Sequence, residues 1–89
     1  MMKKELMIQN KLGLHARAAA LIVKSASAYS SKITFIKDGI EVDGKSIMGI
    51  MMLAAAKGST ITVHTNGDDE VNALETMETL FRNKFGERE

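Results

Sequence analysis

The chain has 89 residues, of which 45% are hydrophobic and 26% are charged, and its formal net charge is +1 at pH 7. This length supports one domain, residues 1–89, with a modest core and little room for an enclosed substrate pocket. The balanced charge and few aromatic residues disfavour a nucleic-acid-binding surface, and the absence of cysteine excludes disulfides and thiolate zinc sites. The longest apolar run, 47–56, falls far short of the ~20 residues needed to span a bilayer, so we expect a cytoplasmic protein without membrane insertion.

The first half of the chain predicts a strand, a helix and a hairpin. Apolar and polar residues alternate over 5–9, which is typical of a short strand with one buried face. The segment 16–28 is rich in alanine, and its apolar residues recur at helical spacing. Two β-prone segments, 33–37 and 40–42, flank Asp38-Gly39, which is a strong signal for a hairpin turn.

The second half predicts a helix, a strand and a helix. Ser46 is suited to cap a short helix over 47–55, and the clean alternation over 60–65 predicts a strand. The pair Asp68-Asp69 is the predicted cap of a last amphipathic helix, which ends near Gly86.

The resulting element order is βαββαβα. It predicts an α+β fold, a two-layer open-faced sandwich in which three helices cover one face of a four-stranded antiparallel sheet. Hydrophobic periodicity alone leaves the order of the strands within that sheet open.

The start of the first helix has an unusual composition. It has no Ser, Thr, Asp or Asn cap and no acid in its first turn, but it carries His15 and Arg17 at the positive end of the helix dipole. A bound anion would be held by the free amides of Ala16, Arg17 and Ala18 and by the guanidinium group of Arg17. Because imidazole is one of the side chains that form covalent intermediates, the pattern predicts a phosphorylation site at His15. The alternative interpretation is a solvated surface pair.

The second predicted helix is apolar on nearly every side. The residues expected to face the core are Ile47, Ile50 and Leu53. Met48 and Met51 are then exposed, and together they would form an adaptable apolar surface for docking partners. The alternative is that these methionines fill gaps in the core, and Met52 is the one most suited to burial.

The other histidine and the acidic residues give no second site. His64 lies on the polar face of its predicted strand, where an ordinary surface role is expected. Two histidines without cysteine are too few for a typical zinc site, and no spacing indicates a Ser-His-Asp arrangement. We therefore expect neither a metal nor a cofactor.

Two segments of the chain resemble a known family. GLHARAAA at 13–20 and GKSIMGIMMLAAAKG at 44–58 strongly resemble the histidine-containing phosphocarrier (HPr) family of the bacterial phosphoenolpyruvate-dependent phosphotransferase system. The similarity covers nearly the whole chain, and the fold of that family is the same open-faced sandwich.

The resemblance implies a role as a phosphoryl carrier. Enzyme I, charged from phosphoenolpyruvate, would phosphorylate His15 on Nδ1, and His15 would donate the group to an enzyme IIA-type protein. Arg17 would hold the phosphoryl oxygens. The protein would be a monomer and a stoichiometric carrier, a substrate of phosphotransferase enzymes that has no turnover of its own.

The resemblance also implies regulation and docking. Ser46 matches a regulatory serine that an ATP-dependent HPr kinase/phosphorylase phosphorylates in many bacteria. Ile47, Met48 and Met51 match the apolar patch that docks enzyme I and enzyme IIA, and Ala20 is expected at the same surface.

One residue departs from the family pattern, and two alternatives remain open. The family usually has proline where this chain has Ala18. Alanine, unlike proline, has a backbone N–H, so one more donor is present at the helix start. The segments 10–13 and 80–87 resemble the nitrogen-related branch of the family, whereas Ser46 within GKSIMG favours the general branch. A regulatory docking protein that carries no phosphate is the other alternative, and the retained histidine–arginine pair counts against it.

Overall fold

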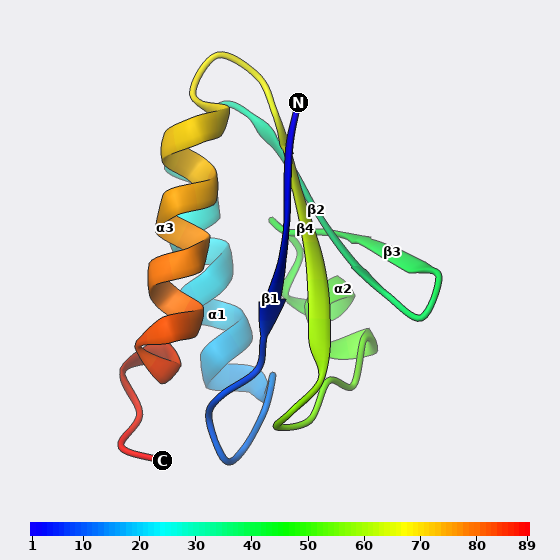
Figure 1. Cartoon of the computed structure of the whole chain (residues 1–89), viewed down its shortest axis with the longest axis vertical. Helices are drawn as coiled ribbons and strands as arrows, with labels where there is room; N and C mark the ends of the chain where they lie inside the picture. The colour runs from blue at the N-terminus through cyan, green and yellow to red at the C-terminus, as the bar shows by residue number, and fades with distance from the viewer.

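Four antiparallel strands form one sheet, as Figure 1 shows. The structure is a computed structural model that describes residues 1–89. Across the sheet the strands are β1 (Met2–Met7), β4 (Thr60–Asn66), β2 (Lys32–Lys37) and β3 (Ile40–Asp43). The last strand in sequence thus pairs with both β1 and β2, so the sheet joins the first strand of the chain to the second half of the domain.

Three helices cover one face of this sheet, so the predicted fold class and element order are confirmed. They are α1 (Ala16–Ala26), α2 (Ile47–Met52) and α3 (Glu70–Arg82), and a 3₁₀ turn, η1 (Lys84–Gly86), follows the last one. In Figure 1, α1 and α3 lie side by side against the sheet. None of these helices combines the length and the apolar character that crossing a membrane requires.

Two of the predicted helix ends are wrong by several residues. α2 stops at Met52 because Ala54 adopts a left-handed conformation with φ +49°. α3 stops at Arg82, since Lys84 and Phe85 have φ values of +55° and +56° and turn the chain back across the domain. None of these three residue types favours positive φ, which is why the sequence does not indicate these turns.

The core lies between the sheet and the helices. The register sets Phe35 of β2 opposite Val63 of β4, and Leu6 of β1 opposite Ile61, with all four side chains buried. The alternate residues of β4 face the open side of the sheet, and His64 is among them, as predicted.

The predicted inward stripe of α2 is partly wrong. Ile50 and Leu53 are buried as expected, but Ile47 is 42% exposed and Met52 is 69% exposed. α2 is only six residues long and packs mainly against α1 and β3, so a narrow stripe of it is covered. The apolar surface of α2 is therefore larger than the sequence pattern indicates.

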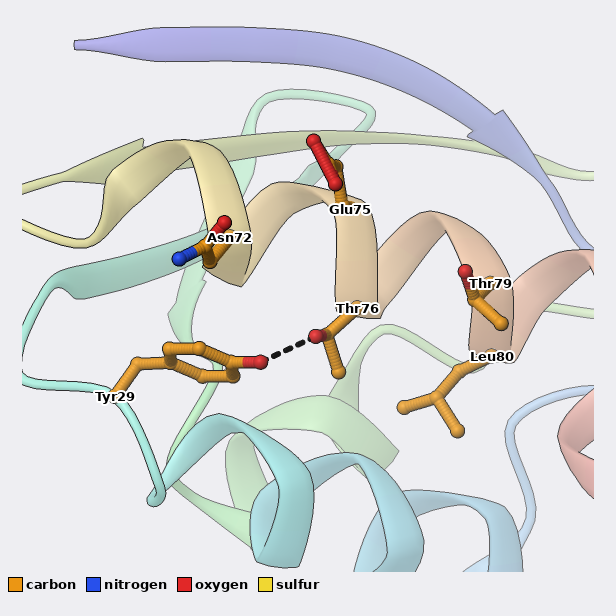
Figure 2. Close-up of a pocket in the computed structure, with 6 residues that line it drawn as sticks. All are labelled: Tyr29, Asn72, Glu75, Thr76, Thr79 and Leu80. Atoms are coloured by element: carbon orange, nitrogen blue, oxygen red, sulfur yellow. Dashed lines mark hydrogen bonds between the residues drawn. The ribbon is translucent and has the colours of Figure 1, made fainter.

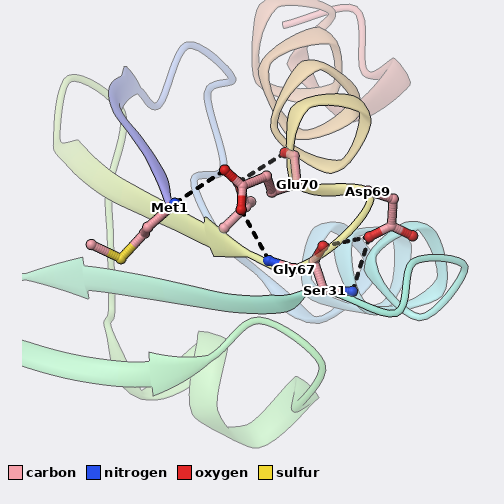
Figure 3. A network of polar contacts seen from close by, with 6 residues as sticks. Met1, Ser31, Gly67, Asp69 and Glu70 are labelled. Carbon is pink, nitrogen blue, oxygen red and sulfur yellow. Dashed lines mark hydrogen bonds and ion pairs between the residues drawn. The ribbon is translucent and has the colours of Figure 1, made fainter.

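The predicted capping of α3 by Asp68-Asp69 is confirmed in position, at Asp69, but not in its hydrogen bond. Asp69 occupies the N-cap position of α3, but its carboxylate makes no capping bond. It accepts hydrogen bonds from the amides of Ser30 and Ser31, both at 3.0 Å, and from the Ser31 hydroxyl, as Figure 3 shows for Ser31. The carboxylate of Glu70 instead accepts from the Gly67 amide at 3.1 Å. Asp69 thus ties the start of α3 to the loop that leads into β2.

Asp69→Asn is expected to change how the stability depends on pH. Hydrogen bonds, first from the Ser31 hydroxyl and then from the Ser30 amide, lower the pKa of Asp69 from 3.8 to about 2. A carboxyl with a depressed folded-state pKa contributes stability above its unfolded-state pKa and loses it as the pH falls through the folded value. The free energy of unfolding of Asp69→Asn should therefore lie below wild type at neutral pH, and the gap should narrow between pH 3.8 and about 2.

Urea unfolding at a series of pH values measures this gap. Asp68→Asn is the matched control, because the exposed Asp68 carboxylate accepts none of these hydrogen bonds. A difference between Asp69→Asn and wild type that stays constant through this pH window would contradict the assignment.

Candidate functional site

His15 lies at the N-terminus of α1, in the cap position. Its backbone is extended, with φ −78° and ψ 177°, and its side chain makes no capping bond. The first backbone hydrogen bond of the helix runs from the Ala19 amide to the His15 carbonyl at 2.9 Å. The amides of Ala16, Arg17 and Ala18 therefore have no acceptor within the helix, and the prediction of an uncapped helix start is confirmed.

The histidine loop, residues 10–15, is held against the segment that follows α2 by main-chain contacts. The Leu14 amide donates to the Ala55 carbonyl at 2.9 Å. Gly13 has φ +68°, and a Cβ on it would lie 2.4 Å from that same carbonyl oxygen. Only glycine permits this approach, and the approach holds the loop that carries His15 against the segment after α2.

The ring of His15 contacts a residue from the far end of the chain. Its Nε2 atom is hydrogen bonded to Oε2 of Glu87, and the other carboxylate oxygen, Oε1, accepts from Asn10 Nδ2 at 3.0 Å. Asn10 Nδ2 also donates to the Gly13 carbonyl at 2.8 Å. Asn10 is fully buried, whereas the side chains of Glu87 and His15 are 13% and 26% exposed. Asn10 and Glu87 are site residues that sequence reasoning missed.

The carboxyl group of Glu87 is held in its ionised form. Burial, the largest single influence, raises its pKa, but the hydrogen bonds from His15 and Asn10 and the nearby positive charge of Arg17 lower it. Together the lowering influences outweigh burial, and the net pKa lies below the ordinary 4.5. Glu87 is thus a carboxylate, and only an acceptor, at neutral pH.

An open hollow of about 520 Å³ lies in front of His15. Its lining residues are Lys11, Leu12, His15, Arg17, Glu87, Arg88 and Glu89. Besides His15, this lining contains three cationic side chains and two carboxylates. Arg17 is exposed and takes part in no salt bridge or side-chain hydrogen bond within the protein, so its guanidinium is free to bind an anion.

Comparison with known proteins identifies the family. The family model described as the PTS HPr component phosphorylation site matches residues 2–83. A phosphocarrier protein HPr from Cupriavidus necator is 47% identical over 89 residues, which covers all of both chains. The chain belongs to the HPr family. The resemblance read from the two sequence segments is thereby confirmed, and with it membership among the phosphocarriers of the phosphotransferase system.

Solved HPr structures share the whole fold. HPr-C-His from Thermoanaerobacter tengcongensis superposes with a TM-score of 0.96 at 45% identity, with both chains fully covered. An HPr dimer from the same organism gives a TM-score of 0.79 at 46% identity, and the match covers 98% of this chain and all of that one.

The second helix carries the other residues predicted from the HPr resemblance. The Ser46 hydroxyl accepts from the Gly49 amide at 3.0 Å, so its predicted capping of α2 is confirmed. Met48, Met51 and Ile47 are exposed, and α2 packs beside α1, where Ala20 is exposed as well. The alternative in which the methionines fill the core is wrong.

A groove of about 460 Å³ lies elsewhere, between Tyr29 and α3. Figure 2 shows the Tyr29 hydroxyl pointing toward Thr76, with which it is hydrogen bonded. Tyr29 follows the C-terminal end of α1, whereas His15 precedes its start, and 11 helical residues span about 16 Å. This groove is separate from the hollow at His15.

Gly13→Ala is expected to destabilise the protein more than Gly58→Ala does. Both glycines have positive φ, but a Cβ at Gly58 has nothing within 4 Å, whereas at Gly13 it collides with the Ala55 carbonyl. Backbone strain alone costs about 1–2 kcal/mol at either position, and the collision adds to it only at Gly13. Urea unfolding measures both variants, and equal losses of unfolding free energy would contradict a close approach at Gly13.

Proposed function

We propose that His15 accepts a phosphoryl group from phosphoenolpyruvate by way of enzyme I and donates it to an enzyme IIA-type protein. The lone pair of Nδ1 forms the bond to phosphorus, and the bond from phosphorus to the donor breaks with its electron pair remaining on the donor. The observation that carries the proposal is a partly open imidazole at an uncapped helix start, next to an unpaired arginine. Donation to the next protein repeats the exchange with His15 as the leaving group.

The phosphoryl oxygens would be held by groups that now lack partners. The amides of Ala16, Arg17 and Ala18 precede the first helical hydrogen bond, and the Arg17 guanidinium is exposed. Alanine rather than proline at position 18 supplies one more N–H for this purpose. Open exposure of the site suits a carrier, which must release the group that it holds.

Docking and regulation are proposed for α2. Exposed Ile47, Met48 and Met51, together with Ala20, form an apolar patch suited to enzyme I and enzyme IIA. Phosphorylation of Ser46 by an HPr kinase/phosphorylase would add about −1.5 to −2 charge at the N-terminal end of α2, where the helix tolerates it. Its effect would fall on partners with an acidic docking surface.

The proposed setting is the cytoplasm, with the protein acting as a stoichiometric carrier of the general branch and lacking catalytic turnover. We propose a monomer, because both the docking patch and the hollow at His15 remain exposed on a single chain. A relative from T. tengcongensis is described as an HPr dimer.

Incubation with phosphoenolpyruvate and enzyme I is expected to add one phosphoryl group to wild type and none to His15→Ala. The matched control is His64→Ala, which removes the other histidine, on the open face of the sheet, and should be phosphorylated like wild type. Intact-mass spectrometry measures the addition, and acid lability identifies a phosphohistidine. A folded wild type that gains no mass would make the chain a regulatory docking protein.

Ser46→Asp is expected to lower kcat/KM with enzyme I roughly five- to thirtyfold, which corresponds to about 1–2 kcal/mol of repulsion at the interface. Ser46→Asn is the matched control, because asparagine caps a helix as well as aspartate does without adding charge. Both variants should unfold at the same urea concentration as wild type. Equal rates for the two variants would remove the regulatory role of a negative charge at this position.

A further inference from the structure

Three hydrogen bonds connect the main chain of the histidine loop to the ring of His15. The Gly13 carbonyl accepts from Asn10 Nδ2 at 2.8 Å, and Glu87 Oε1 accepts from the same nitrogen at 3.0 Å. The second carboxylate oxygen of Glu87 is bonded to His15 Nε2. Asn10 is completely buried, whereas the side chains of Glu87 and His15 are 13% and 26% exposed, so these bonds run from the interior to the hollow in front of His15.

The direction of each of these hydrogen bonds follows from the buried side chain of Asn10. Gly13 offers a carbonyl oxygen and Glu87 a carboxylate oxygen, so the Asn10 amide must present its nitrogen, which has two hydrogens, to both. Turning the amide over would place its oxygen against two acceptors. Glu87 is an ionised carboxylate and can only accept, so the ring nitrogen that contacts it must carry the hydrogen.

We propose that Glu87, oriented by Asn10, is a positioning residue that keeps the ring hydrogen of His15 on Nε2 and thereby leaves the lone pair on Nδ1. A neutral imidazole has one protonated nitrogen and one with a free lone pair, and the partner of the first decides which is which. The role in transfer rests on the proposed phosphocarrier function, whereas the position of the hydrogen does not.

The same contact serves the phosphorylated ring. When Nδ1 bonds to phosphorus, Nε2 keeps its hydrogen, and the ring takes on a positive charge that faces the Glu87 carboxylate. When the group leaves, the electron pair of the N–P bond returns to Nδ1 and the hydrogen on Nε2 stays in place. No proton has to enter or leave the site during either step.

The ¹⁵N NMR spectrum of ring-labelled His15 in unphosphorylated protein tests the assignment directly, at a pH where the ring is neutral. Wild type is expected to show Nε2 at the shift of a protonated nitrogen and Nδ1 at that of an unprotonated one. Glu89→Gln is the matched control, because it removes one negative charge from the same segment and leaves the bond from Glu87 to the ring intact. It should keep the wild-type pattern.

Glu87→Gln should move the hydrogen. Asn10 still donates to the side-chain oxygen, so the glutamine NH₂ group turns toward Nε2 and needs a lone pair there, which favours a hydrogen on Nδ1. Glu87→Ala removes the contact altogether and should give a mixture of the two forms. The remaining charged groups around the ring, Lys11, Arg17, Arg88 and Glu89, are unchanged in both variants. A hydrogen on Nδ1 in wild type, or an unchanged pattern in Glu87→Gln, would overturn the proposal.

Phosphoryl transfer from enzyme I supplies a second readout. Relative to Glu89→Gln, Glu87→Gln should lose at least about tenfold in kcat/KM, in line with the cost of disturbing the partner that orients a functional histidine. An unchanged rate in Glu87→Gln would overturn the role in transfer. If wild type accepts no phosphoryl group but shows the expected ¹⁵N pattern, the proposed function fails and the assignment of the hydrogen by Glu87 stands.

Discussion

The buried amide of Asn10 is the interaction on which the arrangement of the site depends. Its nitrogen joins the histidine loop to the segment after α3, two regions separated by 77 residues in the sequence. A buried amide that makes no hydrogen bond costs about 1–3 kcal/mol, so this position strongly favours the one backbone arrangement that supplies its acceptors. The carbonyl oxygen of the same amide is buried without a partner, so all side-chain hydrogen bonds of Asn10 are donated by its nitrogen.

The site is assembled from three separate parts of the chain. The histidine loop supplies the ring, the segment after α2 holds that loop through main-chain contacts, and the segment after α3 supplies Glu87. The sheet makes this possible, because β4 lies between β1 and β2 and so brings both ends of the chain to one domain. An open site can nevertheless be well ordered when its supports are buried, as Asn10 and Ala55 are.

The fold and the uncapped start of α1 could be predicted because their signals are local. The alternation of apolar residues, the Asp38-Gly39 turn and the missing cap before α1 are each seen within a short stretch of neighbouring residues. The partner of His15 lies 72 residues away, and a single glutamate near Gly86 carries no periodicity that would reveal it. The role of Asp69 is not predictable for the same reason, since its carboxylate accepts from a loop 38 residues earlier rather than from its own helix. The exposure of Ile47 and Met52 depends on how little of α2 its neighbours cover, which the sequence of α2 does not contain.

The contact between Gly13 and Ala55 has an evolutionary consequence. It joins the main chain on one side to the main chain on the other, so it does not depend on the exposed side chains of α2. Substitutions at the exposed positions of that helix can therefore accumulate during evolution without disturbing this main-chain contact. If the proposed docking role of α2 holds, partner preference can change while the position of His15 is kept.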